Sequence, residues 1–182
     1  MKLIKTDIEG VFIFEPNVFG DARGYFFESY NKAFFEQNGL HYDFIQDNQS
    51  LSSYGTIRGL HFQKGKFAQA KLVRVLEGKV LDVAVDLRPN SLTFGKHVAV
   101  ELSAENKRQL LVPRGFAHGF SVLSETAVFA YKCDNIYNKE SESGLRYNDP
   151  DLGIDWKIDM NKALLSDKDA TQPLLKDFVQ CF

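Results

Sequence analysis

The sequence predicts an all-β domain, a sandwich or barrel of short strands, and three observations carry this prediction. Between residues 44 and 133, segments rich in strand-forming residues follow one another closely, separated by glycine, proline or asparagine turns. The stretch LDVAVDL, residues 81–87, alternates apolar and acidic or small side chains with the period of a strand. Sixteen Phe and seven Tyr in 182 residues also favour strands.

The remaining elements follow from local signals. Residues 11–15 are expected to form a first strand, and residues 25–30 are strongly strand-prone. A short helix is expected at 32–37, capped by Asn31 and ended by Gly39. The later strands are expected at 44–52, 56–63, 70–76, 79–87, 96–102, 108–112, 117–123 and 126–133.

The last part of the chain has a different character. Residues 135–151 are polar and turn-rich, and a final helix is expected near 173–180. No linker, internal repeat or low-complexity tract interrupts the sequence, so residues 1–182 are expected to form a single domain.

Composition limits the partners and the compartment. The net charge of −2 gives no electrostatic reason to expect a nucleic acid or an acidic membrane as a partner. The N-terminus lacks a hydrophobic signal core, and no apolar stretch approaches the roughly 20 residues that span a bilayer. With only two cysteines, the protein is expected to be cytoplasmic, with reduced thiols.

Residues 56–74 concentrate polar side chains within strand-forming sequence. Arg58, His61, Gln63 and Lys71 lie there among apolar residues, and an unpaired buried charge is costly. Gly59 allows a bulge that would direct neighbouring side chains into one pocket. We expect His61 to remove a proton from carbon and Lys71 to hold the resulting negative charge; the alternative is a core histidine satisfied by a neighbour.

A second motif specifies the type of β fold. In VPRGFAHGF, residues 112–120, a turn at Pro113 and Gly115 precedes His118, the PxGxxH layout of a cupin double-stranded β-helix. The predicted fold is therefore a cupin jelly roll with short terminal helices. Gln63 stands where many cupins have a second metal-binding histidine, so we expect no metal. His118 is then expected to be a pocket wall or a hydrogen-bond donor to substrate.

Longer segments extend this pattern over nearly the whole chain. They are FGDARGYFFESY (19–30), FIQDNQS (44–50), IRGLHFQ (57–63), AQAKLVRVLEGKVLDVAVDLR (68–88), SAENKRQLLVPRGFAHGF (103–120), FAYK (129–132) and SDKDATQPLL (166–175). In these segments the sequence closely resembles the dTDP-4-dehydrorhamnose 3,5-epimerase family of the nucleotide-sugar pathways.

The resemblance implies a reaction. The substrate would be dTDP-4-dehydro-6-deoxy-D-glucose, whose C4 ketone acidifies the hydrogens on C3 and C5. Removal of each hydrogen and return of a proton on the opposite face would give dTDP-4-dehydro-L-rhamnose. Because the ketone itself accepts the electrons, neither a metal nor a redox cofactor is implied.

Four residues match the family's catalytic positions. His61 matches the base, and a neutral imidazole near pH 7 suits proton abstraction. Asp169 matches the carboxylate that orients this histidine, although Asp167 nearby stays open as the partner. Lys71 matches the lysine beside the C4 oxygen, and Tyr131 matches the acid on the opposite face.

Seven further polar residues match family positions that bind the substrate: Arg23, Arg58 and Lys168 for the diphosphate, and Glu28, Gln46, Asn48 and Glu142 for the nucleotide and sugar. Phe26 and Tyr137 are candidate stacking partners for thymine. Of Asp82 and Asp86, one is expected to pair with Lys71 or His118 and the other to be exposed.

The resemblance also implies a homodimer. N-terminal strands of each subunit would complete the other's pocket, so Arg23 and Glu28 would serve the partner's site. Three alternatives stay open at this point: an epimerase acting at C3 or C5 alone, a cupin that binds a sugar nucleotide without converting it, and a metal-dependent cupin oxygenase.

Overall fold

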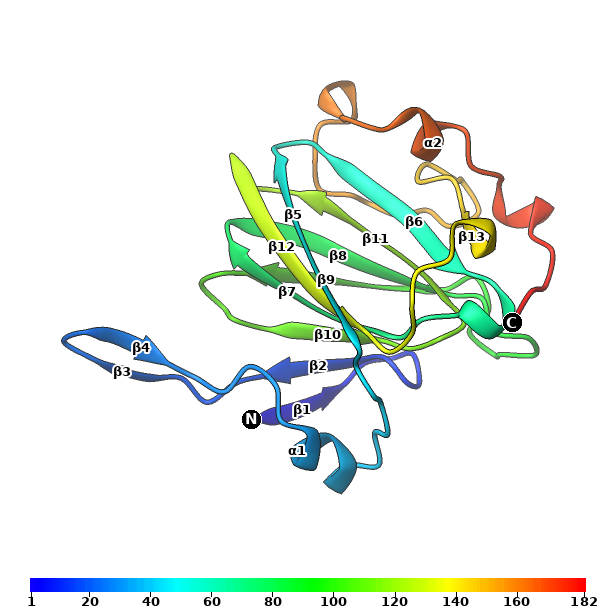
Figure 1. Cartoon of the computed structure of the whole chain (residues 1–182). Helices are drawn as coiled ribbons and strands as arrows, with labels where there is room; N and C mark the ends of the chain where they lie inside the picture. The colour runs from blue at the N-terminus through cyan, green and yellow to red at the C-terminus, as the bar shows by residue number, and fades with distance from the viewer.

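The computed structural model describes every residue from Met1 to Phe182, and its centre is a sandwich of two antiparallel β-sheets (Figure 1). In sheet order, the six-stranded sheet consists of β1 (Lys2–Lys5), β2 (Phe12–Glu15), β10 (Gln109–Val112), β7 (Lys71–Glu77), β12 (Thr126–Cys133) and β5 (Gln46–Ser53). The five-stranded sheet consists of β13 (Glu142–Gly144), β6 (Ile57–Gln63), β11 (Phe116–Val122), β8 (Lys79–Asp86) and β9 (His97–Ser103).

This architecture confirms the predicted all-β fold class. The strands expected between residues 44 and 133 are β5 to β12, each within two residues of its predicted bounds. Glycines end strands where the turn needs a positive φ, as at Gly55 (80°) and Gly78 (76°). A Cβ on Gly78 would lie 2.0 Å from the carbonyl oxygen of Thr126, so only glycine fits there.

Apolar side chains fill three spaces. The largest cluster lies between the sheets and includes Val73, Leu110 and Phe129. A second covers the outer face of the five-stranded sheet, where the C-terminal segment packs through Trp156 and Phe178. Figure 1 shows that segment, in orange and red, beside β6. The outer face of the six-stranded sheet is covered by the N-terminal layer.

That N-terminal layer is built around helix α1 (Lys32–Gln37), which has the predicted bounds. The side chain of Asn31 accepts a hydrogen bond from the backbone N–H of Phe34 at 3.1 Å, as expected of an N-cap. Phe35 is buried and stacks on Phe14 of β2, with ring centroids 4.5 Å apart. None of the helices is both long and apolar enough to span a bilayer.

Two predictions for the ends of the chain were wrong. The strand-prone segment 25–30 forms only the end of β4 (Gly24–Phe26), which pairs with β3 (Phe19–Asp21) in a hairpin. Figure 1 shows this hairpin extending away from the sandwich. The final helix is a single 3₁₀ turn, Leu175–Asp177, because an eight-residue helix is marginal alone and apolar contacts decide its shape.

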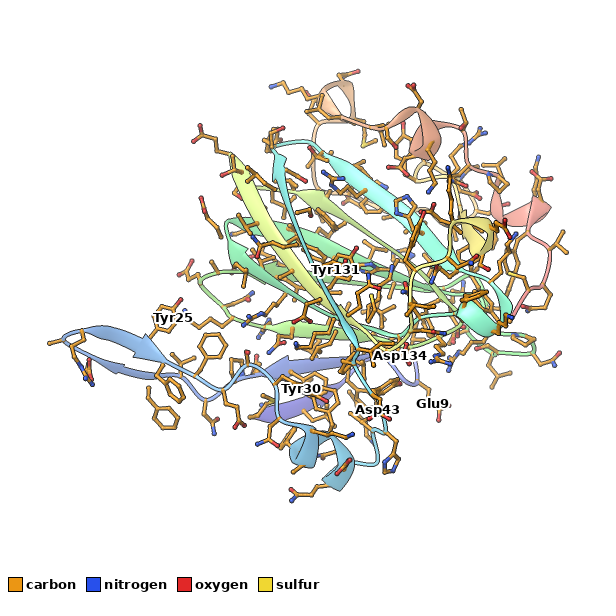
Figure 2. All side chains as sticks on the ribbon, in the orientation of Figure 1. Glu9, Tyr25, Tyr30, Asp43, Tyr131 and Asp134 are labelled. Atoms are coloured by element: carbon orange, nitrogen blue, oxygen red, sulfur yellow. The ribbon has the colours of Figure 1, made fainter.

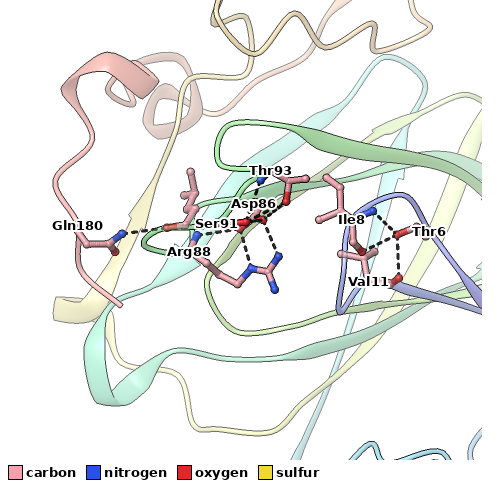
Figure 3. Close-up of polar contacts among 9 residues, drawn as sticks. Thr6, Ile8, Val11, Asp86, Arg88, Ser91, Thr93 and Gln180 are labelled. Atoms are coloured by element: carbon pink, nitrogen blue, oxygen red, sulfur yellow. Dashed lines mark hydrogen bonds and ion pairs between the residues drawn. The ribbon is translucent and has the colours of Figure 1, made fainter.

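The end of β8 holds a fully buried carboxylate, contrary to the prediction that one of the two aspartates of this strand is exposed. Asp86 accepts hydrogen bonds from Arg88 at 2.7 and 2.9 Å and from the hydroxyls of Ser91 and Thr93 at 2.6 Å (Figure 3). Burial opposes ionisation, but these donors outweigh it and lower the pKa of Asp86 to about 2. The cluster fixes the loop that leads to β9.

Candidate functional site

Polar side chains line one end of the space between the two sheets because of strand register. His61 of β6 lies directly opposite His118 of β11, and Lys71 of β7 lies directly opposite Cys133 of β12. Residues opposite one another on neighbouring strands project to the same face. Lys71 shares its face of β7 with Val73, so the same alternation that builds the apolar core directs an ammonium group to its polar end.

A bulge adjusts β6 where the sequence predicted one. His118 pairs with His61 while Phe120 pairs with Arg58, so β6 carries one more residue than β11 between these pairs. Gly59 lies at the bulge with a φ of +134°, and a Cβ there would lie 2.5 Å from the Cα of Gly119. A close approach of the two backbones at this point therefore requires glycine on both strands.

The ring of His61 is held by Asp169, whereas Asp167 is exposed. His61 Nε2 lies 2.5 Å from Asp169 Oδ1. Asp169 is buried in the short helix α2 (Asp167–Ala170), whose cap is Ser166. Burial alone would raise the pKa of Asp169, but hydrogen bonds from His61 and Ser166 outweigh it and the pKa lies below its ordinary value. An ionised Asp169 therefore faces the imidazole.

An ionised carboxylate accepts hydrogen bonds and donates none. A neutral imidazole paired with it therefore carries its hydrogen on Nε2, which leaves the lone pair on Nδ1. The dyad joins residues 108 positions apart in the sequence.

A cavity of about 290 Å³ opens beside this histidine, between the two sheets. Its walls are Gln46, Asn48, His61, Phe62, Gln63, Gln69, Lys71, Tyr131, Tyr137 and Glu142. His61 comes from the five-stranded sheet, while Lys71 and Tyr131 come from the six-stranded sheet. Figure 2 shows Tyr131 in the middle of the sandwich. A molecule in this cavity would have the imidazole on one wall and the ammonium and phenol on the other.

Lys71 is the one lysine or arginine that lines this cavity, and it has no ion-pair partner in the chain. Its ammonium lies 5.8 Å from the centre of the Tyr131 ring. Burial lowers the pKa of Lys71, and the negative charges of Asp82 and Glu142 and the thiol of Cys133 act against this effect. The free N–H groups are thus available to an oxygen atom in the cavity.

The two neighbours of Lys71 on β12 are protonated near neutral pH. Burial raises the pKa of the Tyr131 phenol above its ordinary value. Burial also raises the pKa of the Cys133 thiol to about 11, although Lys71 acts in the opposite direction. Tyr131 is therefore a proton donor rather than a phenolate.

A second cavity, of about 320 Å³, adjoins the other side of His61. Arg58, Lys168 and Asp169 line it together with His61, and Arg58 donates a hydrogen bond to the hydroxyl of Ser52 at 3.0 Å. Of the two cavities that adjoin His61, this one has both an arginine and a lysine, a donor set suited to phosphate oxygens.

An ion pair links the two cavities: Lys168 contacts Glu142, and Glu142 also accepts a hydrogen bond from the Tyr137 hydroxyl at 3.0 Å. Burial opposes ionisation of Glu142, but these contacts lower its pKa overall.

Besides His118, three predicted site residues lie away from these cavities, all in or next to the N-terminal hairpin. Arg23 is exposed at the tip of the β3–β4 hairpin, where it pairs with Asp21 at 2.6 Å. Phe26 is 71% exposed on the same hairpin, and Glu28 is exposed and accepts a hydrogen bond from Asn31 at 3.0 Å. Figure 2 labels Tyr25 on this hairpin, well away from Tyr131. Within one chain, these side chains do not reach the cavity.

Other contacts were not anticipated. Gln69 and Phe62 line the main cavity, and no local pattern distinguishes them from ordinary strand and loop residues. His118, in contrast, was expected in the pocket but lines neither cavity; it is buried and pairs with Asp82, which was one of the predicted pairings. The structure has no group of three or more His, Cys, Asp or Glu side chains that could hold a metal ion.

Known proteins resemble this chain over nearly its full length. A family model described as dTDP-4-dehydrorhamnose 3,5-epimerase matches residues 5–177. The dTDP-4-dehydrorhamnose 3,5-epimerase of Pseudomonas aeruginosa is 52% identical, covering 100% of this chain and 99% of its own.

Two solved structures share the fold. The dTDP-4-dehydrorhamnose 3,5-epimerase of Elizabethkingia anophelis has a TM-score of 0.93 and 64% identity, covering 97% of each chain. The dTDP-6-deoxy-D-glucose-3,5-epimerase of Legionella pneumophila, in complex with dTDP-4-keto-L-rhamnose, has a TM-score of 0.93 and 50% identity. That match covers 98% of this chain and 94% of the other.

Proposed function

The chain belongs to the dTDP-4-dehydrorhamnose 3,5-epimerase family and is an isomerase of that type, and from this premise we propose that it converts dTDP-4-dehydro-6-deoxy-D-glucose to dTDP-4-dehydro-L-rhamnose. One observation carries the proposal: a histidine–aspartate dyad faces a tyrosine and an unpaired lysine across a single cavity. Residues 1–182 act in this proposal as one catalytic domain.

His61 is the base of the proposed reaction. Its Nδ1 takes the hydrogen on C3 or C5 as a proton, and the electron pair of the broken C–H bond forms an enolate with its charge on the C4 oxygen. The imidazole becomes an imidazolium, which Asp169 stabilises through the hydrogen bond at Nε2. Because the electrons stay in the substrate, we expect no cofactor and no metal.

Lys71 stabilises the enolate. Its ammonium projects into the cavity without an ion-pair partner in the chain, so a developing oxyanion does not have to displace a carboxylate. A preorganised cation in a partly dry cavity lowers the energy of the charged transition state by a few kcal/mol.

Tyr131 is the proposed acid. It projects from the other sheet, so its proton reaches the enolate carbon on the face opposite His61, which inverts that carbon. The tyrosinate and the imidazolium then return to their starting protonation states by exchange with water. The same steps at the second carbon complete the conversion.

In the proposed complex, the nucleotide lies along the two cavities beside the His61–Asp169 dyad. Arg58 and Lys168 bind the diphosphate from the second cavity, since both line it and both are cationic. Tyr137 stacks on thymine, with Gln46, Asn48 and Glu142 around the nucleotide and sugar. His118, directly opposite His61 on β11 and hydrogen-bonded to Asp82, supports the wall behind His61.

A homodimer accounts for the hairpin. Phe19, Tyr25 and Phe26 are 65%, 63% and 71% exposed there, an apolar surface that a second copy of the chain would cover. Arg23 and Glu28 would then reach the cavity of that copy and bind its nucleotide. The proposed enzyme works in the cytoplasm, in the synthesis of dTDP-rhamnose.

Isotope exchange tests the reaction. Incubation of the protein with dTDP-4-dehydro-6-deoxy-D-glucose in deuterated water is expected to place label on both C3 and C5, and reduction of the product is expected to give the rhamnose nucleotide. Label on one carbon alone would make the protein a single-site epimerase, and binding of the sugar nucleotide without label would make it a binding protein.

A further inference from the structure

Gln63 lines the main cavity, but the mechanism above does not use it. The residue ends β6, directly opposite Glu142 of β13, and its side chain is buried. A glutamine amide offers two N–H donors and one carbonyl acceptor. Both donors and the acceptor of Gln63 are bound to backbone atoms of the chain, so the residue has no free N–H for a ligand.

Two of these hydrogen bonds flank Tyr137. Gln63 Nε2 donates to the carbonyl oxygen of Ile136 at 3.0 Å, and Gln63 Oε1 accepts from the backbone N–H of Asn138 at 2.6 Å. These two atoms belong to the peptide groups on either side of Tyr137. Because each peptide group is planar, holding both of them fixes the backbone from which the Tyr137 ring projects.

The third hydrogen bond ties this loop to a neighbouring one. Gln63 Nε2 also donates to the carbonyl oxygen of Phe67 at 2.9 Å, in the 3₁₀ turn Gly65–Phe67. Asn135 adds a parallel link, since its side chain donates to the carbonyl oxygen of Lys66 at 2.9 Å. Side-chain amides thus join the two loops beside the cavity.

Apolar packing does little to hold the loop that carries Tyr137. Residues 134–141 connect β12 of one sheet to β13 of the other, and Figure 1 shows this connection in yellow. Ile136 and Tyr137 are 55% and 53% exposed and belong to none of the three apolar clusters. Hydrogen bonds therefore set the position of the Tyr137 ring, whose hydroxyl donates to Glu142 at 3.0 Å.

We propose that Gln63 is a positioning residue: by holding the peptide groups on both sides of Tyr137, it fixes that ring as the stacking surface for the base of the nucleotide. The inference rests on the role proposed above for Tyr137. It also gives a function to the residue that stands where many cupins have a metal-binding histidine. Gln63 then acts on the affinity for the nucleotide and leaves the chemistry to His61 and Asp169.

Gln63→Met and Thr6→Val are the matched variants. Methionine is unbranched, like glutamine, and fills a similar space without making these hydrogen bonds. The hydroxyl of Thr6 also holds a turn through backbone atoms, the carbonyl oxygens of Ile8 and Val11, but it lies between β1 and β2 and lines neither cavity (Figure 3). Thr6→Val therefore removes comparable bonds away from the site.

Calorimetric titration with dTDP tests the proposal through a double-mutant cycle of Gln63→Met and Tyr137→Ala. The Kd is expected to rise by about fivefold or more in Gln63→Met and by about tenfold or more in Tyr137→Ala, because base stacking is weakened or lost. Thr6→Val should stay within about twofold of wild type. In the Tyr137→Ala background, Gln63→Met should change the Kd by less than about twofold, since the ring through which it acts is absent.

Two results of the cycle would overturn the proposal. One is a Kd in Gln63→Met within twofold of wild type. The other is an equal effect of Gln63→Met with and without Tyr137, which would show a general loss of structure. In turnover, KM should rise in Gln63→Met while kcat changes by less than about threefold, since the dyad is intact.

A further measurement needs no variant to fold. The amide hydrogen of Asn138 is bonded to Gln63, so its exchange with solvent in the wild-type chain should be at least about tenfold slower than in an unstructured peptide. Exchange at the unstructured rate would overturn the proposal. Binding and amide exchange do not depend on turnover, so a missing isotope label at C3 and C5 would refute the epimerase separately. An unchanged Kd in Tyr137→Ala would refute the stacking role and this inference together.

Discussion

The two ends of the space between the sheets are built by the same strands, but one end is filled by apolar side chains and the other carries polar side chains that face a cavity. On β7, Val73 and Val75 pack into the apolar end, while Lys71 on the same face projects into the cavity. On β12, Phe129 stacks on Phe120 with centroids 4.2 Å apart, and Tyr131 lies two residues further on. One end holds the sandwich together, and the other exposes an ammonium and a phenol to the substrate.

The comparison teaches how to recognise a site within a core. At the apolar end every large side chain has apolar neighbours, and a buried polar group elsewhere, such as Asp86, is saturated by donors. At the cavity end the ammonium of Lys71 lines the cavity without an ion-pair partner in the chain, 5.8 Å from the centre of the Tyr131 ring. A charged group that lines a cavity in the core without a partner in the chain lowers stability, so its presence indicates a functional role.

The strongest test of the comparison is His61→Ala. We expect kcat for exchange at both carbons to fall by about 10³-fold or more, since no other base lies in the cavity with its ring held by a carboxylate. The Kd for dTDP should change little, because the base contacts the sugar carbons. Exchange rates by NMR and dTDP binding by calorimetry measure the two effects.

The exposed His41 provides the control: His41→Ala should leave both quantities unchanged. Substantial exchange at either carbon in His61→Ala would place the base elsewhere.

Lys71→Met comes next. Loss of the cation beside the enolate is expected to lower kcat by about 10²–10³-fold. The free energy of unfolding should change little, since the ammonium has no ion-pair partner in the chain and lies beside the Tyr131 ring. Lys79→Met, which removes a surface lysine paired with Glu101 at 3.2 Å, is the matched control. If Lys71→Met lost stability but kept its kcat, Lys71 would have a structural role, like the residues of the apolar end, and no catalytic one.

The pH profile gives the same residue a second test. Because burial lowers the pKa of Lys71, its ammonium is lost at a lower pH than that of an ordinary lysine. On the alkaline side, activity is therefore expected to fall as pH rises through that lowered pKa, because the ammonium is lost. A kcat profile that stays flat up to the ordinary lysine range would contradict this assignment.

Leu110→Ala is the reciprocal test, at the apolar end. Leu110 is fully buried on β10 between Ile13 of β2 and Val73 of β7. The cavity left by truncation is expected to lower the free energy of unfolding by about 2–5 kcal/mol. Denaturant unfolding measures this loss, and kcat at low temperature should stay within about twofold of wild type. A large fall in kcat of the folded variant would show that the two ends are coupled.

Most of the strands that build the two ends could be predicted from the sequence. The eight strands from β5 to β12 were found because glycines at forced turns separate segments of clear strand character. The short β1, β3 and β13 were missed, since three or four residues carry little periodicity and such strands depend on their partners. The final helix was wrong because contacts of Phe178 with Phe62 and Phe182 outweigh local propensity.

Some of the site residues also have a local signal in the sequence, and others do not. His61 and Lys71 were identified by polar residues within strands, a local signal. Asp169 has no local signal, because the contact spans 108 residues and its segment is indistinguishable from a solvated charged turn. Only the family resemblance selected Asp169 over Asp167. Gln69 and the pairing of Asp82 with His118 needed the register of the sheets.

Tyr131→Phe is the finest test, because it separates two steps within the cavity end. The phenol is assigned to proton return on the face opposite His61, so epimerisation should fall by about 10–10²-fold. Exchange of deuterium into the starting sugar should fall less, because removal and return of a proton on the His61 side need only the imidazole.

The ratio of exchange to epimerisation in deuterated water is therefore expected to rise in Tyr131→Phe. Tyr42→Phe is the control, since Tyr42 is also partly buried but packs in the N-terminal layer. Equal losses of exchange and epimerisation in Tyr131→Phe would show that the phenol positions the sugar for His61 instead of supplying the proton. In that case the acid must come from another group on the six-stranded sheet, and Lys71 is the one that lines the same wall.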